Sequence, residues 1–425
     1  MTRTKTQRRS LVGLSSLIVA HYVSWFGNVI TTVTVPLYVL GMTESGVQTG
    51  LAGFANTLPL VVAGALAGVF IDRLGGRAVS VAADLAAGAL TLVLPFLIEG
   101  TDSPFVFLMV VLFVRSLIAA PAASARLSLI ERMSSDAGVR LESSNTLFQS
   151  AQRVALIVGA PLAGVLFVVW GGPTALFIDA GTFFVAAIIL WFGVPKPPED
   201  RAPSSDGDAG SRSYFGMLAD GFTYVRSSPL IVAILAVIIV SNFLDDAFAP
   251  LLLPAYSVEV LGSAGLLGVL LAGAGIGSVI GMFLYIPASV RVLRNRNWTF
   301  VASLLVVGLL RLVLVAYPSL PLAVVVVFLV GLAGAPLNPL LVTVMQILVP
   351  THLQGRVFSL VSGLAMAAVP LGVLAAGVAL DLVGLRASLA IFAGGYVLLV
   401  AVCLCIPALR GLNVKAKETD EVAAV

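Results

Sequence analysis

The sequence predicts an all-α integral membrane protein, with twelve transmembrane helices in two pseudo-symmetric six-helix bundles. Of its 425 residues, 59% are hydrophobic and only 11% are charged, whereas a soluble domain carries roughly 25% charged residues. The mean hydropathy of +1.07 agrees with a chain whose apolar surface faces lipid. These values exclude a soluble enzyme and a nucleic-acid-binding domain, although the net charge is +3.

Twelve apolar runs in the sequence each predict one transmembrane helix. A helix needs about 20 apolar residues to cross a bilayer. Runs bounded by Gly, Pro or charged residues lie at 11–40, 47–71, 78–98, 104–125, 147–169, 174–194, 229–256, 264–288, 298–317, 320–348, 356–382 and 385–409. We therefore expect one span for each run.

The polar stretch between the sixth and seventh runs divides the chain. It covers 195–228 and is rich in Pro and Ser. This composition indicates a cytoplasmic linker. We expect an N-terminal six-helix bundle at 1–194, a C-terminal six-helix bundle at 229–410 and a cytoplasmic tail at 411–425.

A weak internal repeat supports two equivalent bundles. Asn28 and Pro36 of the first run recur as Asn242 and Pro250 of the seventh, both 214 residues later. Repeats of this kind characterise transporters, whose substrates bind between the repeats near the middle of the membrane.

The basic residues predict the orientation. With both termini in the cytoplasm, only Arg386 of the 24 Lys and Arg residues lies in an outer loop, and Arg115, Arg153 and Arg311 lie within spans. This count assigns Arg126 to an inner loop. Because basic loops are retained on the cytoplasmic side, we expect a multi-pass protein of the cell (inner or plasma) membrane with both termini cytoplasmic.

A charged glycine-rich segment joins the second and third runs, and contains Gly68, Asp72, Arg73, Gly75 and Arg77. It resembles motif A of the major facilitator superfamily. Glycines permit close helix approach and a tight reversal, and a carboxylate is favourable at the positive end of another helix. The resemblance implies that Asp72 holds the cytoplasmic side closed by meeting the eleventh span near Gly355 and Arg356.

A second segment, with Gly159, Pro161 and Gly164 in the fifth run, resembles part of motif C of the exporters in this superfamily. Ala160 and Ala163 replace two glycines of that pattern. Proline removes a backbone hydrogen bond and bends the helix, while glycines allow close packing. A generic packing bend is the alternative interpretation.

Four acids within the runs are candidates for proton coupling: Asp84, Asp179, Asp245 and Asp246. A carboxyl that binds and releases a proton inside the membrane is what a proton-coupled carrier requires. We prefer Asp245 or Asp246, because two adjacent buried acids favour the protonated carboxyl that coupling requires. A further reason is that the macrolide-efflux and siderophore-exporter branch, which the chain resembles, commonly has Asp where this chain has Asn28. The alternative for this pair is a polar cluster at the helix end near the outer mouth. For the other two acids, we expect structural ion pairs.

Arg115 lies near the middle of the fourth run. Its position resembles the motif B arginine of drug:proton antiporters, which implies a coupling or gating role; a structural ion pair is the alternative. An arginine at the centre of a spanning helix costs at least about 2.5–3.5 kcal/mol, so it needs a partner. The sequence leaves the pairing of the buried Arg and Asp residues open.

Polar and aromatic residues in the runs are candidates to line a substrate cavity. Ser24, Asn28 and Thr31 share one helix face, because they are spaced at i, i+4 and i+7. The other candidates are Trp25, Phe148, Gln152, Phe243, Asn338 and Gln346. The resemblance places the cavity among the first, fourth, seventh and tenth spans.

The resemblance implies a secondary active transporter rather than an enzyme: a proton-coupled exporter (antiporter) of hydrophobic or amphipathic small molecules such as drugs, working by alternating access. Its partners would be the substrate, protons and the lipid bilayer, and we expect a monomer. No phosphate loop, metal-ligand pair or catalytic triad stands out in the sequence, so we expect no metal and no cofactor, with the proton as coupling ion.

Two other functions stay open. One is a dedicated exporter of a single endogenous metabolite, such as a siderophore, an antibiotic or a lysophospholipid. The other is a membrane sensor or lipid-modifying enzyme. The charge of the substrate also stays open, because the buried acids suit a cation whereas Arg115 and Arg311 suit an anionic group.

Overall fold

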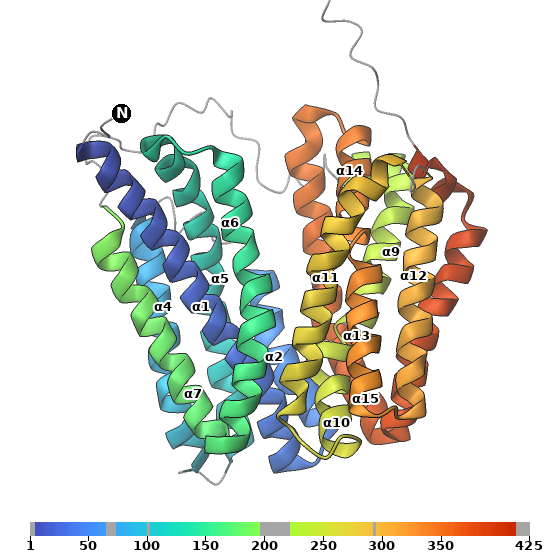
Figure 1. Cartoon of the computed structure of the whole chain (residues 1–425), viewed down its shortest axis with the longest axis horizontal. Helices are drawn as coiled ribbons and strands as arrows, with labels where there is room; N and C mark the ends of the chain where they lie inside the picture. The colour runs from blue at the N-terminus through green and yellow to red at the C-terminus, as the bar shows by residue number, and fades with distance from the viewer. Residues whose placement is uncertain (1–4, 65–73, 100–102, 196–221, 292–294, 414–425) are drawn as a thin grey trace, which may run out of the picture. The chain divides into compact units, whose positions relative to one another are not determined.

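The computed structural model describes residues 5–64, 74–99, 103–195, 222–291 and 295–413. These parts of the chain are built from helices joined by short turns, and they contain no strand. The all-α fold class is therefore confirmed for the described residues (Figure 1).

The helices follow the apolar runs. The first half of the chain forms α1 (Lys5–Thr43), α2 (Gly46–Gly64), α4 (Gly76–Glu99), α5 (Pro104–Ala137), α6 (Leu141–Val154), the π-helix η1 (Ala155–Gly159) and α7 (Ala160–Gly193). The second half forms α9 (Pro229–Asp245), the π-helix η2 (Phe248–Leu252), α10 (Leu253–Glu259), α11 (Leu266–Arg291), α12 (Arg296–Val313), the 3-10 turn η3 (Leu314–Ala316), α13 (Leu320–Gly334), α14 (Leu337–Leu348), α15 (Thr351–Cys405) and η4 (Pro407–Asn413).

Nine helical segments in the described parts are long and apolar enough to cross a membrane. Two of them, Ser143–Gly193 and Arg356–Cys405, each cover two predicted runs. Gly171 (φ 81°) and Gly384 (φ 74°) turn the chain within them, in a conformation that glycine adopts without strain. The remaining predicted run begins with α2, whose described part ends at Gly64. The count of twelve spans stays a prediction.

The chain forms two compact units. Unit 1 consists of Met1–Gly207, Asp246–Gly275 and Pro370–Ser388, and unit 2 of Asp208–Asp245, Ile276–Val369 and Leu389–Val425. Unit 1 thus includes two segments from the second half of the sequence. The bundle boundaries predicted from the sequence stay a prediction, and most of the proposed linker and tail lies outside the described residues.

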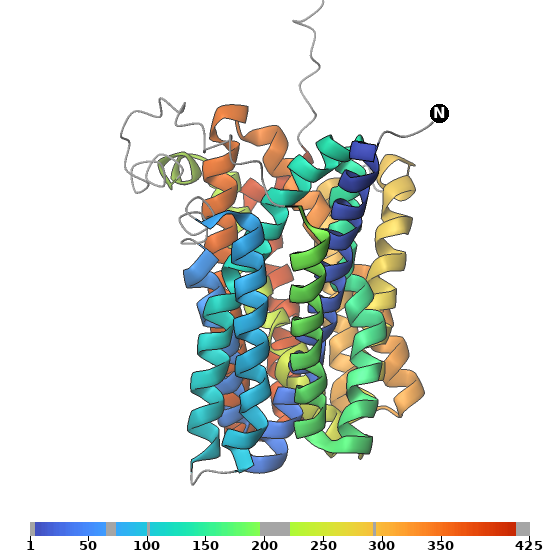
Figure 2. The ribbon, with the colours of Figure 1, turned by 90° about the vertical axis from the view of Figure 1, so that its left-hand side faces the viewer.

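In unit 1, α1 packs against α7 and α5, and α4 packs against the same two helices (Figures 1 and 2). Their contacts form two separate apolar clusters. The first includes Leu17, Val81, Ile130 and Leu190, and the second includes Val39, Leu94, Leu108 and Leu176. Each cluster takes residues from all four helices, so the part of the helices between the clusters forms a layer of its own.

In unit 2, small residues bring helices close together. A Cβ atom added to Gly277 or Gly281 of α11 would collide with the backbone of α13 at Phe328 or Leu332. Gly395 of α15 is similarly covered by the side chain of Leu244 in α9. The contact of Gly395 with Leu244 brings α15 against α9, which carries the acid of the charged pair described below.

Candidate functional site

Polar side chains occupy the layer between the two apolar clusters of unit 1. We call this set the polar layer: His21, Ser24, Asn28, Thr31, Asp84, Arg115, Arg126 and Asp179. All are buried except for Asn28, which is half-buried. Ser24, Asn28 and Thr31 do share the face of α1 that meets these charges, as their spacing predicts. Because buried charges need partners, the layer holds two ion pairs.

Arg115 of α5 and Asp179 of α7 form the first pair. The Arg115 Nη2 atom lies 3.5 Å from Asp179 Oδ2 and donates a hydrogen bond of 3.2 Å to Asn28 Oδ1. Thr31 donates its hydroxyl hydrogen to the same carboxylate oxygen, and the guanidinium group lies 5.0 Å from the centre of the Phe183 ring. The predicted need of Arg115 for a partner is met.

This first pair is incompletely bonded. Asp179 Oδ1 and Arg115 Nε are buried and have no hydrogen-bond partner among the described residues. The 3.5 Å separation is longer than the about 2.8 Å of a close charge-assisted hydrogen bond. Gly27 leaves the space beside the carboxylate, since a Cβ atom there would collide with Asp179 and Thr182.

Asp84 of α4 and Arg126 of α5 form the second pair. Arg126 donates to both carboxylate oxygens of Asp84. The assignment of Arg126 to an inner loop is wrong: it lies within α5, and it is only 3% exposed. Asp84 has the structural partner that we expected for it.

Aromatic rings close the polar layer next to this second pair. His21 stacks on Phe148 of α6 with 3.6 Å between the ring centres, and it accepts a 3.1 Å hydrogen bond from Trp25 Nε1. Phe148 is 7% exposed, so this predicted cavity residue is packed within unit 1. Trp25 is half-buried.

Unit 2 holds a third charged pair. Arg311 of α12 donates to Asp245 Oδ1 over 2.5 Å and lies 4.9 Å from the centre of the Tyr396 ring of α15. The Asp245 side chain is 47% exposed, compared with 10% for Arg311. Asp246, the other preferred acid, is half-buried.

The other cavity candidates lie in different surroundings. Gln152 of α6 is exposed in unit 1. In unit 2, Phe243 is half-buried and stacks on Phe392 with 6.0 Å between ring centres, while Asn338 and Gln346 are exposed. The predicted cavity residues are therefore divided between the two units.

The exporter-like segment forms a close helix contact in unit 1. Gly164 packs against the backbone of Gly265, and Gly268 packs against the backbone of Ala160 and Pro161. The π-helix η1 ends at Gly159, two residues before Pro161, where the missing N–H interrupts the regular hydrogen-bond ladder. The predicted irregular, tightly packed helix is present.

Most of the motif A segment, including Gly68, Asp72 and Arg73, lies outside the described residues. Gly75 has a φ of 79°, which agrees with a tight reversal there. Arg77 donates to the carbonyl oxygen of Trp191, and its guanidinium group lies 5.1 Å from the centre of that ring. The predicted contact of Asp72 with the eleventh span stays a prediction.

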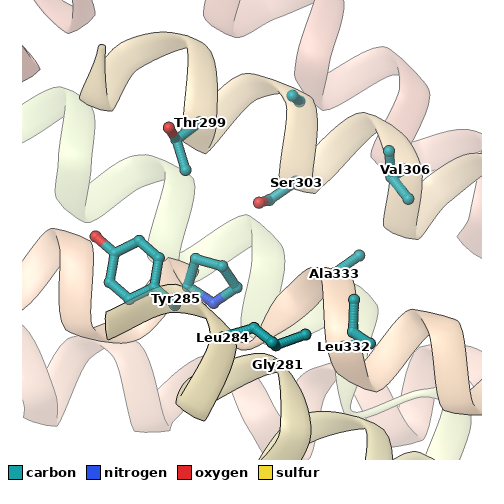
Figure 3. A pocket seen from close by; sticks show the side chains of 10 residues that line it. Gly281, Leu284, Tyr285, Thr299, Ser303, Val306, Leu332 and Ala333 are labelled. Atoms are coloured by element: carbon teal, nitrogen blue, oxygen red, sulfur yellow. The ribbon is translucent and has the colours of Figure 1, made fainter. Parts of the chain in front are cut away.

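Two pockets in the described parts are lined by residues other than the predicted ones. In unit 2, a pocket of about 270 Å³ lies between α11, α12 and α13 (Figure 3). Its wall is mainly apolar, with hydroxyl groups from Tyr285, Thr299 and Ser303. In unit 1, a pocket of about 470 Å³ includes Glu44 and Glu259. Among the described residues, no three His, Cys, Asp or Glu side chains lie close enough to hold a metal ion.

Three residues that take part in the charged pairs or in contacts between helices were not predicted from the sequence. Arg126 was hidden by its position at the end of an apolar run, and Tyr396 by its single polar atom in an apolar helix. The third is Asp381 of α15, which accepts hydrogen bonds from Ser45 Oγ (2.7 Å) and Val47 N (2.9 Å), and from Gly46 N, at the start of α2. A lone acid at the end of the eleventh run was the available signal.

Known proteins resemble this chain over nearly its whole length. The sequence model of the Major Facilitator Superfamily matches residues 17–368 and 235–424. The multidrug efflux pump Tap of Mycolicibacterium fortuitum is 29% identical over 417 residues, covering 97% of this chain and 100% of that protein. The macrolide efflux protein A of Streptococcus pyogenes is 25% identical, covering 93% of this chain and 97% of that protein.

Solved structures share the fold at low sequence identity. The nucleoside transporter NupG aligns with a TM-score of 0.70 and 14% identity, covering 92% of this chain and 98% of that one. A bacterial homolog of the human lysosomal transporter Spinster, in an inward-facing and unoccupied conformation, aligns with a TM-score of 0.70 and 16% identity, covering 97% and 98%. Apolar helices, the charged layer within them and the family match together make this chain a member of the major facilitator superfamily.

Proposed function

We propose that this protein is a proton-coupled exporter of hydrophobic or amphipathic small molecules such as drugs, working by alternating access. The observation that carries the proposal is its similarity, over 97% of the chain, to a protein named multidrug efflux pump. The close packing at Pro161 and Gly268, in the segment that resembles the exporter motif, supports export rather than import.

Three charged pairs within apolar helices support coupling to an ion. The Arg115–Asp179 pair is the better candidate in unit 1, because Asp179 Oδ1 lacks a partner among the described residues, whereas both carboxylate oxygens of Asp84 accept from Arg126. A proton bound at Asp179 would neutralise the carboxylate and leave Arg115 uncompensated. Since an unpaired buried charge is costly, protonation and a movement of Arg115 would be linked.

The Arg311–Asp245 pair is the candidate in unit 2. Its carboxylate is half exposed, whereas its arginine is nearly covered, so protons would reach Asp245 from water while Arg311 stays in place. Asp245 and Asp246, the acids preferred from the sequence, remain candidates for the proton-coupling site. We propose in addition that the protein is a monomer of the cell membrane with both termini cytoplasmic, is not an enzyme, and needs no metal or cofactor.

Drug accumulation in cells that lack their own efflux pumps tests the proposal. We expect the wild-type protein to lower the accumulation of lipophilic drugs, and a protonophore to abolish this effect. Asp179→Asn or Asp245→Asn should remove gradient-driven efflux when the changed acid carries the proton. Asp136→Asn is the matched control, because Asp136 forms an exposed ion pair with Arg132 and such pairs contribute little.

The outcomes separate the parts of the proposal. Efflux that persists with the protonophore would show that proton coupling is wrong, whatever the substrate. A wild-type protein that changes the accumulation of no compound in a broad drug panel would contradict drug export itself. Unchanged efflux in both Asp variants and in Asp246→Asn would move the coupling site elsewhere.

A further inference from the structure

Arg153 of α6 differs from the arginines of the three ion pairs described above. Arg115, Arg126 and Arg311 each contact an aspartate. Arg153 forms no ion pair with any of the described residues, and its Nη1 atom is buried without a hydrogen-bond partner among them. An ionisable residue within a spanning helix is a candidate functional group, because an uncompensated charge there is unfavourable.

The two faces of α6 show where Arg153 points. One face packs into unit 1 through Ser144, Phe148 and Ala151, all buried. Arg153 and Gln149 lie on the opposite face, with Gln152 at its edge. Gln149 and Gln152 are exposed, and Arg153 is half-buried. The polar residues therefore lie away from the core of the unit.

The same face does not point to lipid, because it continues into a protein contact. One turn further along, Leu156 and Ile157 contact Gly275 of α11, and beyond them Ala160 and Pro161 contact Gly268. Exposed glutamine side chains and a half-buried arginine within a spanning helix, on a face that continues into a protein contact, are typical of the lining of a water-filled cavity.

We propose that Arg153, assisted by Gln149 and Gln152, binds the carboxylate of an amphipathic organic anion or zwitterion during transport. A guanidinium group presents two parallel N–H donors to a carboxylate, and the glutamine amides supply further donors beside it. The arginines of the three ion pairs are already neutralised, so Arg153 supplies the positive charge for recognition. This inference deepens the proposed function, since it names a substrate class.

Binding of two matched dyes to the purified full chain in phosphatidylcholine nanodiscs tests the proposal. Rhodamine B carries a free carboxylate, and its ethyl ester keeps the same cationic ring system without that charge. We expect Arg153→Gln to weaken the binding of rhodamine B about tenfold, as the loss of one charge-assisted interaction would. Binding of the ester should stay unchanged or become tighter, because a repulsive charge is removed.

Further variants make the test specific. Arg153→Lys keeps the charge and should lose less affinity for rhodamine B than Arg153→Gln. Gln149→Ala should weaken the same dye by a smaller factor. Arg132→Gln removes an exposed arginine that pairs with Asp136, and should change the binding of neither dye. If Arg153→Gln does not yield folded protein, the Lys and Gln149 variants carry the test with the same criterion.

Equal losses for both dyes would overturn the proposal, because they would indicate a structural role for Arg153. Failure of the wild-type protein to bind rhodamine B would overturn it as well. The proposed function fails separately: cells that show no drug efflux contradict export, whereas a dye-selective effect of Arg153 on the purified protein supports this site on its own.

Discussion

At the scale of single residues, the two ion pairs of the polar layer are bonded to different extents. Both carboxylate oxygens of Asp84 accept a hydrogen bond from Arg126. Asp179 shares one oxygen between Thr31 and Arg115 and leaves the other without a partner among the described residues. The Nε atoms of both arginines lack a partner among the described residues, so the two pairs differ at the carboxylate. A carboxylate with both oxygens bonded is suited to hold helices together, whereas one with a free oxygen is suited to change its protonation.

We expect Asp84→Asn to destabilise the protein strongly, because it leaves Arg126 buried without its counter-charge. Breaking a buried pair on one side costs about 3–5 kcal/mol. The double variant Asp84→Asn/Arg126→Gln should be more stable than Asp84→Asn alone, since neither charge then remains. Thermal unfolding of the purified variants in detergent measures this, and additive losses in the double variant would contradict the structural role of the pair.

The sequence did not predict which aspartate pairs with which arginine. The i, i+4, i+7 spacing of Ser24, Asn28 and Thr31 predicted a shared polar face, and the structure places that face on the charged groups. Which acid meets which arginine depends on how α4, α5 and α7 pack against α1. The spacing within one helix carries no information about that arrangement.

At the scale of helices, the close contact between α7 and α11 involves a glycine and an interruption of the backbone hydrogen bonds. The π-helix η1 and Pro161 break the regular hydrogen bonding where α7 approaches α11. Gly268 lets the two backbones touch, because a Cβ atom there would lie 2.6 Å from Pro161 Cα. Proline leaves no N–H at this point, so the irregular turn and the close contact occur together.

Gly268→Ala should therefore lower the melting temperature and reduce transport, since the clash is with backbone atoms that cannot turn away. Gly181→Ala in α7 is the matched control, because nothing lies within 4 Å of its added Cβ atom. Alanine favours a helix over glycine by about 1 kcal/mol, so the control should be as stable as the wild type or more stable. Equal melting temperatures for the two variants would contradict the contact.

Hydropathy predicted the positions of the helices well but their junctions less well. The described helices follow the apolar runs because a bilayer requires about 20 apolar residues for each crossing. Gly171 and Gly384 each join two apolar runs through a single residue with positive φ. A glycine-rich membrane sequence contains many glycines that could form such a turn, so the sequence does not show which ones do. The π-helices end just before Pro161 or include Pro250, and they were missed because an apolar run does not distinguish a π-helical turn from an α-helical one.

At the scale of the whole molecule, unit 1 joins parts of both halves of the sequence. The segment Pro370–Ser388 of α15 belongs to it and packs on the start of α2, where Gly377 touches the backbone of Gly46. Asp381 accepts the bonds of Ser45, Gly46 and Val47 there. A carboxylate at a helix N-terminus is stabilising, because it satisfies free N–H groups and the helix dipole.

Under the proposed alternating-access mechanism, this contact would open in each cycle, because it ties the first half of the sequence to the second. Asp381→Asn removes the negative charge and should make the open form more frequent. Thr49 is a suitable reporter: it is 1% exposed and lies on the helix face of Gly46 and Gly50, which contacts α15.

In a background with Cys403→Ser and Cys405→Ser, we expect Thr49→Cys to react several-fold faster with a membrane-impermeant maleimide once Asp381→Asn is added. Intact cells should show this reaction, because the positive-inside rule places the junction of α1 and α2 outside. The additional variant Glu44→Gln is the matched control, since Glu44 lies at the same junction but forms none of the bonds to α2. Equal rates with and without Asp381 would contradict the role of this contact in opening, and reaction only in permeabilised cells would contradict the predicted orientation.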